Sequence, residues 1–187
     1  MNIVQIGVCE ANDDLTQLIN NQQPNKLVLV EPFSVHNSRI LDCYEWVNNF
    51  SLENVAIVTD DRKDKITFFY HENDGPLYEV ASLNMNHILK HGYSIDGLKT
   101  LVVDSMNINQ LFDKYELKHI DILYIDAEGL DDQIIKSINI DSYSIDNIYF
   151  ENLHLTQADI YQYLVDKGYD ITMSTGGCGW TSLAKKI

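Results

Sequence analysis

Residues 3–31 read IVQIGVCEANDDLTQLINNQQPNKLVLVE. The apolar run Ile3–Gly7 predicts a short strand that ends at a glycine turn, and apolar residues in Leu15–Ile19 then recur at helical spacing. The next run, Lys26–Glu31, is continuously apolar up to its final glutamate, as expected for a strand that is covered on both faces. A strand, a helix and a second strand in this order indicate a parallel α/β sheet.

The rest of the chain continues this alternation of strands and helices. Further strands are predicted at 52–57, 65–70, 98–103, 120–125, 147–151, 169–173 and 179–184, and helices at 40–47, 108–115, 134–138 and 160–165. The turn signal Gly176-Gly177 separates the last two strands with no helix between them, which predicts a hairpin with an antiparallel member. A length of 187 residues suits one domain over residues 1–187.

Charge and cysteine content exclude several classes of protein. The 13 Lys+Arg and 28 Asp+Glu give a net charge of −15, which repels phosphate backbones and anionic membranes, so neither nucleic acid nor membrane is an expected partner. No leader pattern opens the chain and no apolar run approaches ~18 residues. Cys9, Cys43 and Cys178 form no closely spaced pair, which predicts reduced thiols and a cytoplasmic protein.

Glu31 is a candidate ribose ligand at the edge where an open α/β sheet binds its ligands. It ends the second strand roughly 20 residues beyond the first glycine turn, where a carboxylate can accept both hydroxyls of a ribose; the alternative is an ordinary surface carboxylate. Of the three glycines that a dinucleotide fingerprint needs, only Gly7 is present, with Cys9 and Asn12 at the other two positions. The turn therefore suits a nucleoside without phosphates and disfavours an NAD-dependent oxidoreductase.

An acidic segment follows the strand predicted at 120–125. Asp126 and Glu128 precede Gly129 and either face a ligand or cap the helix that follows. Facing a ligand, they could hold a cationic cofactor, bind a metal or remove a proton, but no further ligand accompanies them at fixed spacing and no metal site is expected. His154 is a candidate general base for a hydroxyl, although a lone histidine in a loop is more often not catalytic.

Five stretches of the chain occur in the order seen in the FkbM family. They are Val4–Asp13, Val30–Pro32, Asn54–Ile57, Ile122–Asp131 and Tyr149–Glu151 followed by His154. From about Ile3 to Gly168-Tyr169 the sequence resembles this family of S-adenosylmethionine-dependent methyltransferases, most specifically in the pattern I-D-x-E-G-x-D. The resemblance implies a class I, Rossmann-like α/β fold, S-adenosylmethionine as cofactor, and methylation of hydroxyls on sugars or secondary metabolites.

The resemblance also implies roles for single residues. Those expected to bind the cofactor are Gly7, Glu10, Asn12, Glu31, Pro32, Phe33, Ala56, Ser82 and Asp126, and those expected in catalysis are Asp126, Glu128 and His154. Gly7 would lie under the methionine part of the cofactor and Glu31 would bind the ribose. Pro32-Phe33 and Ala56 would lie near the adenine, and Asp126 with Glu128 would line the junction between cofactor and acceptor.

Two departures from the family pattern bear on activity. Val8-Cys9 and Ala11 replace the usual residues of the first turn, which would narrow the cofactor pocket or weaken binding. The sequence starts directly at the first strand, without the helices that cover the active site in many methyltransferases. A cover must then come from residues 70–97, which we expect to be an insertion near the active site, or from another subunit, or be absent.

The expected function is methyl transfer from S-adenosylmethionine to a hydroxyl of a sugar, polysaccharide or small metabolite. The expected partner is accordingly a small-molecule or glycan acceptor. Whether the protein also forms a homo-oligomer is left open. The alternative is a catalytically degenerate member of the same fold that binds the nucleoside, or nothing, and serves as an interaction module.

Overall fold

The computed structural model describes residues 1–11, 14–19, 22–60, 64–153, 157–172 and 181–187. The strands of the larger sheet are β1 (Asn2–Ile6), β2 (Lys26–Val30), β3 (Phe50–Glu53), β7 (His119–Ile125), β8 (Ser144–Glu151), β9 (Tyr169–Thr172) and β10 (Thr181–Lys186). The strands of the smaller sheet are β4 (Val55–Val58), β5 (Lys65–His71) and β6 (Leu98–Asn107). The helices are α1 (Asp14–Ile19), α2 (Asn37–Tyr44), α3 (Met85–Lys90), α4 (Ile108–Lys114), α5 (Asp131–Ser137) and α6 (Gln157–Asp166), with a 3-10 turn at Ser34–His36.

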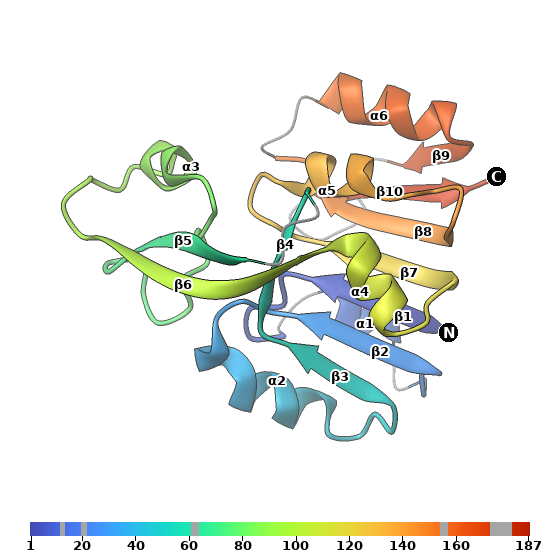
Figure 1. The fold of residues 1–187 in the computed structure, drawn as a ribbon, viewed down its shortest axis with the longest axis horizontal. Coiled ribbons are helices and arrows are strands. Elements are labelled where there is room, and N and C mark those ends of the chain that lie inside the picture. The colour runs from blue at the N-terminus through green and yellow to red at the C-terminus, as the bar shows by residue number, and fades with distance from the viewer. Residues whose placement is uncertain (12–13, 20–21, 61–63, 154–156, 173–180) are drawn as a thin grey trace.

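The larger sheet has seven strands in the order β3-β2-β1-β7-β8-β10-β9 (Figure 1). Its first five strands in this order are parallel, and β10 is antiparallel to both β8 and β9. The prediction of a mostly parallel α/β sheet with an antiparallel strand near the C-terminus is therefore confirmed. The predicted turn at Gly176-Gly177 lies outside the described residues.

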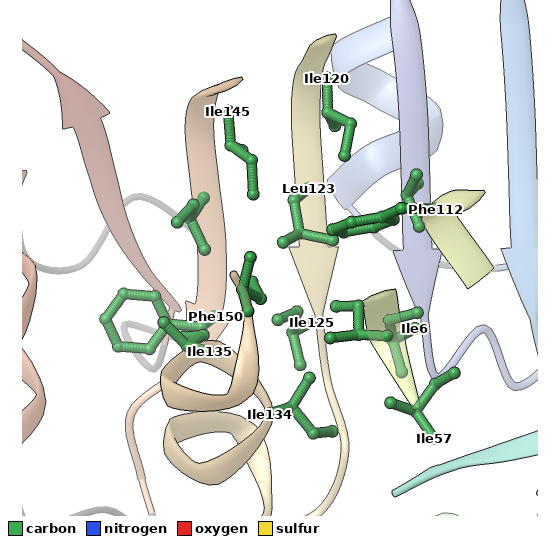
Figure 2. Packing of buried hydrophobic residues seen from close by; sticks show 14 of the residues in the cluster. Ile6, Ile57, Phe112, Ile120, Leu123, Ile125, Ile134, Ile135, Ile145 and Phe150 are labelled. Atoms are coloured by element: carbon green, nitrogen blue, oxygen red, sulfur yellow. The ribbon is translucent and has the colours of Figure 1, made fainter. Parts of the chain in front are cut away.

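The central strands are mostly apolar because helices cover both faces of the sheet. On one face Val4 and Leu123 belong to the core cluster that also contains side chains of α4, α5 and α6. On the other face their neighbours Ile3 and Tyr124 pack in a second cluster with side chains of α1 and α2. Figure 2 shows the first face, where Phe112 of α4 lies against Leu123. None of the helices in the described residues has the length and apolar character needed to cross a membrane.

The prediction of one strand over residues 52–57 is wrong. The strand β3 ends at Glu53, β4 begins at Val55, and the two belong to different sheets. The Asn54 side chain fixes the crossing, because its amide donates to the Glu31 carbonyl at 2.9 Å and exchanges two 2.8 Å hydrogen bonds with Asn37. Apolar periodicity does not report a change of sheet inside an apolar run.

The smaller sheet was not predicted as a separate layer. Its order is β4-β6-β5, with β4 parallel and β5 antiparallel to β6. Residues 72–97, which include α3, connect β5 to β6 and correspond closely to the segment expected to be an insertion. Figure 1 shows β5, β6 and α3 to one side of the larger sheet.

Candidate active site

A pocket lies at the carboxyl ends of β1, β2 and β7, where strand order in an open α/β sheet predicts a ligand site. Its walls come from both sheets and from the β5–β6 connection. They include Gly7, Glu31, Asp126, Ile57, Phe68 and Tyr78. Pro32, Phe33 and Glu128 also line it, so six of the residues expected at the site lie together there.

The turn after β1 needs a glycine at position 7. Gly7 has φ +75° and donates its N–H to the Val30 carbonyl at 3.0 Å. On its other side, a Cβ at this position would lie 1.8 Å from the carbonyl oxygen of Asp126. The ends of β1 and β7 therefore approach so closely that no side chain fits between them.

We expect Gly7→Ala to lower the free energy of unfolding by about 2–5 kcal/mol. The alanine would have to adopt a left-handed backbone conformation, and its Cβ would clash with the carbonyl group of Asp126. Denaturant titration measures the loss. Gly75→Ala is the matched control, since Gly75 has φ +74° and no atom lies within 4 Å of the place that a Cβ would take. We expect it to cost only about 1 kcal/mol, and equal losses in the two variants would contradict the close approach.

Glu31 is buried at the end of β2, with 6% of its surface exposed. Its Oε2 accepts hydrogen bonds from the backbone N–H of Val8 at 3.2 Å and of Cys9 at 2.8 Å. Its Oε1 accepts from the N–H of Phe33 at 2.8 Å. The carboxylate therefore ties the first turn to the end of β2, which rules out the alternative of an ordinary surface carboxylate.

Asp126 and Glu128 do not cap α5. The N-cap of this helix is Leu130, which has no side-chain capping bond, so the capping alternative is wrong. Asp126 is exposed at the pocket, and Glu128, with φ +48°, turns its side chain so that Oε2 lies 3.0 Å from Nε2 of His87 in α3. Both carboxylates line the pocket, as the spacing along the chain predicted.

Two polar residues of this site were not predicted from the sequence. Asp131 is fully buried and accepts hydrogen bonds from the N–H groups of Ala127 and Glu151, each at 3.3 Å, so it holds together the ends of β7 and β8. Its place in the I-D-x-E-G-x-D pattern was the available signal. The signal for His87 was its spacing of four residues from His91, which puts both on one face of a helix.

Three of the remaining expected residues, Glu10, Ala56 and Ser82, lie outside the pocket lining. Glu10 pairs with Arg39, with 3.1 Å between Oε2 and Nε. Ala56 is buried in β4, where its neighbours on either side reach the pocket instead. Ser82 is buried and donates to the Glu128 carbonyl at 3.3 Å, behind the pocket wall. Asn12 and His154 lie outside the described residues.

An aromatic cluster joins the part of the pocket beside Glu31 to the smaller sheet. The ring of Phe33 lies 5.8 Å from that of Phe68, 5.7 Å from Tyr70 and 5.6 Å from Tyr78, measured between centroids. The apolar pattern of the sequence predicts only a strand for the aromatic run at 68–70. Its rings form a wall for a flat, apolar group beside Glu31.

The thiol in the first turn ionises less readily than that of an ordinary cysteine. Cys9 lines the pocket, and burial together with the nearby Glu31 carboxylate raises its pKa to about 12. Cys9 and Cys43 are free thiols, and Cys178 lies outside the described residues.

The carboxyl groups around the pocket hold protons more tightly than usual. Burial raises the pKa of Glu31 to about 7 and that of Glu151 to about 8, and the charge of Asp126 adds to both shifts. Burial, with the charges of Asp74 and Glu79, raises the pKa of Glu128 to about 7. Among the described residues, no lysine or arginine forms an ion pair with these three glutamates. The pocket therefore favours a cationic ligand.

These shifts predict how stability depends on pH. The folded pKa values lie above the ordinary value of 4.5, so the folded protein binds more protons than the unfolded chain up to about pH 8. Burial lowers the pKa values of His36, His87 and His91, so at and below about pH 6.5 these side chains bind fewer protons in the folded protein than in the unfolded chain. Their contribution to stability therefore rises with pH in that range. We therefore expect the melting temperature to fall from about pH 6.5 to about pH 8.5 at constant ionic strength.

The control for this pH dependence is Glu151→Gln, which resembles the protonated side chain. Because Glu151 has the highest pKa of the three glutamates, the variant should show a flatter curve over the same range. A melting temperature that rises with pH in the unmodified protein would contradict the assignment.

The strand order of the larger sheet, with its antiparallel strand and a pocket at the strand ends, defines the class I methyltransferase fold. Two solved structures share this fold. The O-methyltransferase from Bacillus cereus in complex with SAH is 11% identical, with a TM-score of 0.51 over 99% of this chain and 74% of that chain. A chain of the fibrillarin/Nop5p complex is 9% identical, with a TM-score of 0.50 over 100% of this chain and 72% of that chain.

The model of the methyltransferase FkbM domain matches residues 5–171, and the chain belongs to the FkbM methyltransferase family. This confirms the family resemblance of the sequence. Among curated proteins, no match was found.

Proposed function

We propose that the protein transfers a methyl group from S-adenosylmethionine to a hydroxyl oxygen of a sugar, polysaccharide or small metabolite. The observation that carries the proposal is the acidic pocket at the ends of β1, β2 and β7. When bound, the cofactor supplies an electrophilic methyl group on a positively charged sulfur. Carboxylates in a partly buried pocket stabilise such a charge more strongly than water-exposed ones would.

The residues of the pocket fit the parts of this cofactor. Glu31 would accept the ribose hydroxyls, Phe33 would pack beside the adenine, and the backbone at Gly7 would approach the methionine part. A carboxylate offers about four acceptor positions, of which backbone N–H groups already take three at Glu31. Binding both hydroxyls would therefore displace the longest of these bonds, the one from Val8.

Asp126 and Glu128 would act on the acceptor. A carboxylate within hydrogen-bond reach can orient the hydroxyl and accept its proton while the oxygen attacks the methyl group. The raised pKa of Glu128, about 7, makes it a stronger base near neutral pH than an ordinary glutamate. His87 holds this side chain toward the β5–β6 connection, on the acceptor side of the pocket.

The β5–β6 connection would supply the cover for the acceptor. Leu77, Tyr78, Glu79, Ala81 and Leu83, all from this segment, line the pocket opposite the strand ends. We therefore treat residues 1–187 as one methyltransferase domain in which residues 70–97 form an insertion that recognises a small-molecule or glycan acceptor. Reduced thiols and the acidic surface are consistent with a cytoplasmic site of action.

Calorimetry with S-adenosylhomocysteine tests the cofactor, and transfer of label from methyl-labelled S-adenosylmethionine to hydroxyl compounds tests the reaction. We expect one molecule bound per chain and label on oxygen. Binding of the nucleoside without transfer to any hydroxyl acceptor would favour the second candidate function, a binding module. The hydrogen bonds that already occupy Glu31 favour that candidate. Absence of binding would contradict the proposal.

A further inference from the structure

We propose that His87, His91 and Glu128 bind a divalent transition-metal ion at the rim of the pocket. The two histidines lie on successive turns at α3, with their ring centroids 4.6 Å apart. Glu128 comes from the loop after β7, and its Oε2 lies 3.0 Å from Nε2 of His87. One ligand atom from each of the three residues lies within 4.8 Å of the others.

These distances approach those of a coordination sphere. Ligand atoms bound at about 2.0–2.1 Å to one ion lie roughly 3.0–3.4 Å apart when they occupy neighbouring positions. The His87–Glu128 distance of 3.0 Å already falls in this range. His91 is exposed at the end of α3, and its ring already lies beside that of His87, so a small shift of the ring would close the remaining distance. An ion would take the place of the proton now shared between His87 and Glu128.

The surrounding residues hold the three ligands in place. Ser82 donates to the Glu128 carbonyl at 3.3 Å and accepts from the N–H of Asn84 at 3.2 Å. Asn84 in turn caps α3 by accepting from the N–H of Asn86 at 3.0 Å. One buried hydroxyl therefore links the backbone of one ligand to the start of the helix that carries the other two. These contacts fix the backbone positions from which the ligands extend, as outer contacts around metal sites do.

The chemistry of the ligands indicates the class of ion. Two imidazole nitrogens and one carboxylate suit Zn²⁺, Co²⁺ or Fe²⁺ rather than Mg²⁺ or Ca²⁺, which prefer oxygen ligands. The charges of Asp74 and Glu79 act on Glu128, and a bound cation would relieve this repulsion. The expectation of no metal rested on spacing along the chain, which shows no Cys/His cluster and no further ligand close to Asp126 and Glu128, whereas His87 and His91 come from a segment about 40 residues earlier.

Three protein ligands leave coordination positions open, and Glu128 lines the pocket. With the ion bound, Asp126 rather than Glu128 would accept the proton of the hydroxyl, and the ion would hold an oxygen of the acceptor. This role rests on the proposed function, but binding of the ion does not. A second group of candidate ligands, His119, Asp121 and Asp146, has no buried member, and Asp121 already accepts from the N–H of Asn2 at 2.6 Å.

The test is titration of the metal-free protein with Co²⁺, followed by visible absorption, and with Zn²⁺ in competition with a chromophoric chelator. We expect one ion per chain. Glu128→Gln and His91→Ala should each weaken binding by roughly tenfold or more, since even outer-shell changes reach that size. The matched control His119→Ala removes a histidine from the second group and should leave the affinity unchanged.

Two results would overturn the metal site. One is absence of stoichiometric Co²⁺ or Zn²⁺ binding by the folded protein, and the other is binding that survives His91→Ala. Circular dichroism of each variant confirms folding, and the exposed position of His91 makes its replacement the safer of the two. Calorimetry with S-adenosylhomocysteine in the presence of a chelator tests the cofactor separately, so failure of one proposal does not imply failure of the other.

Discussion

We expect replacement of Glu31 with alanine to lower the affinity for S-adenosylhomocysteine by ~100-fold or more. The variant would lose the two charge-assisted bonds proposed to the ribose, each contributing about 1.5–3 kcal/mol. The change also frees the N–H groups of Val8, Cys9 and Phe33, which shape the turn under the cofactor. Calorimetry at about pH 8 is the appropriate measurement, because Glu31 with a pKa of about 7 is then mostly ionised.

Two variants separate the ribose contact from general effects. Glu31→Gln keeps the shape and one acceptor oxygen, so we expect a loss of about tenfold, smaller than that of the alanine variant. Asp113→Ala removes an exposed carboxylate that pairs with Lys118, and should leave the affinity unchanged despite the same change in net charge. A folded Glu31→Ala protein that binds as tightly as the unmodified protein would show that Glu31 does not bind the ribose.

Replacing Asp126 with asparagine should lower turnover by ~100-fold or more while leaving cofactor affinity within roughly tenfold. Asparagine keeps the size of the side chain but cannot accept the proton of the hydroxyl. The structure strengthens this prediction, because Asp126 lines the pocket and does not cap α5. Turnover is measured as transfer of labelled methyl to an acceptor found in the labelling experiment.

The matched control is Asp132→Asn, in the same acidic stretch of sequence. Asp132 pairs with Lys136 on the surface of α5 and does not line the pocket, so its replacement should leave turnover unchanged. Equal turnover in Asp126→Asn and the unmodified protein would refute a catalytic role for Asp126. Equal losses in the two asparagine variants would instead indicate an effect of net charge.

The larger sheet could be predicted because its strands carry a local pattern. Continuous apolar runs such as Lys26–Val30 occur when both faces of a strand are buried, and the two core clusters show this burial directly. Glu31 and Asp126 could be located for a related reason. Each follows directly after such a run, and the carboxyl ends of parallel strands meet at one edge of the sheet.

The smaller sheet and the contact between His87 and Glu128 depend on residues far apart in the sequence, so no local pattern predicts them. Asn54 ends one strand by bonding to Glu31 and Asn37, which are 23 and 17 residues away. Glu128 meets His87 across 41 residues, through a loop with positive φ that apolar spacing cannot indicate. The fold of the larger sheet could therefore be predicted from the sequence, whereas the smaller sheet and its contacts with Glu128 required the structure.

The chain enters the smaller sheet after Asn54 and leaves it at Asn107, where a capping box begins α4. The chain enters at Val55, which pairs with Asp104 of β6, and it leaves at Asn107 of the same strand β6. The points of entry and exit therefore lie only a few residues apart. A segment with such closely spaced ends can be lengthened or exchanged while β1, β2 and β7 keep their positions. Under the proposed function, relatives with a different smaller sheet would differ in the acceptor that they methylate and keep the same site for the methyl donor.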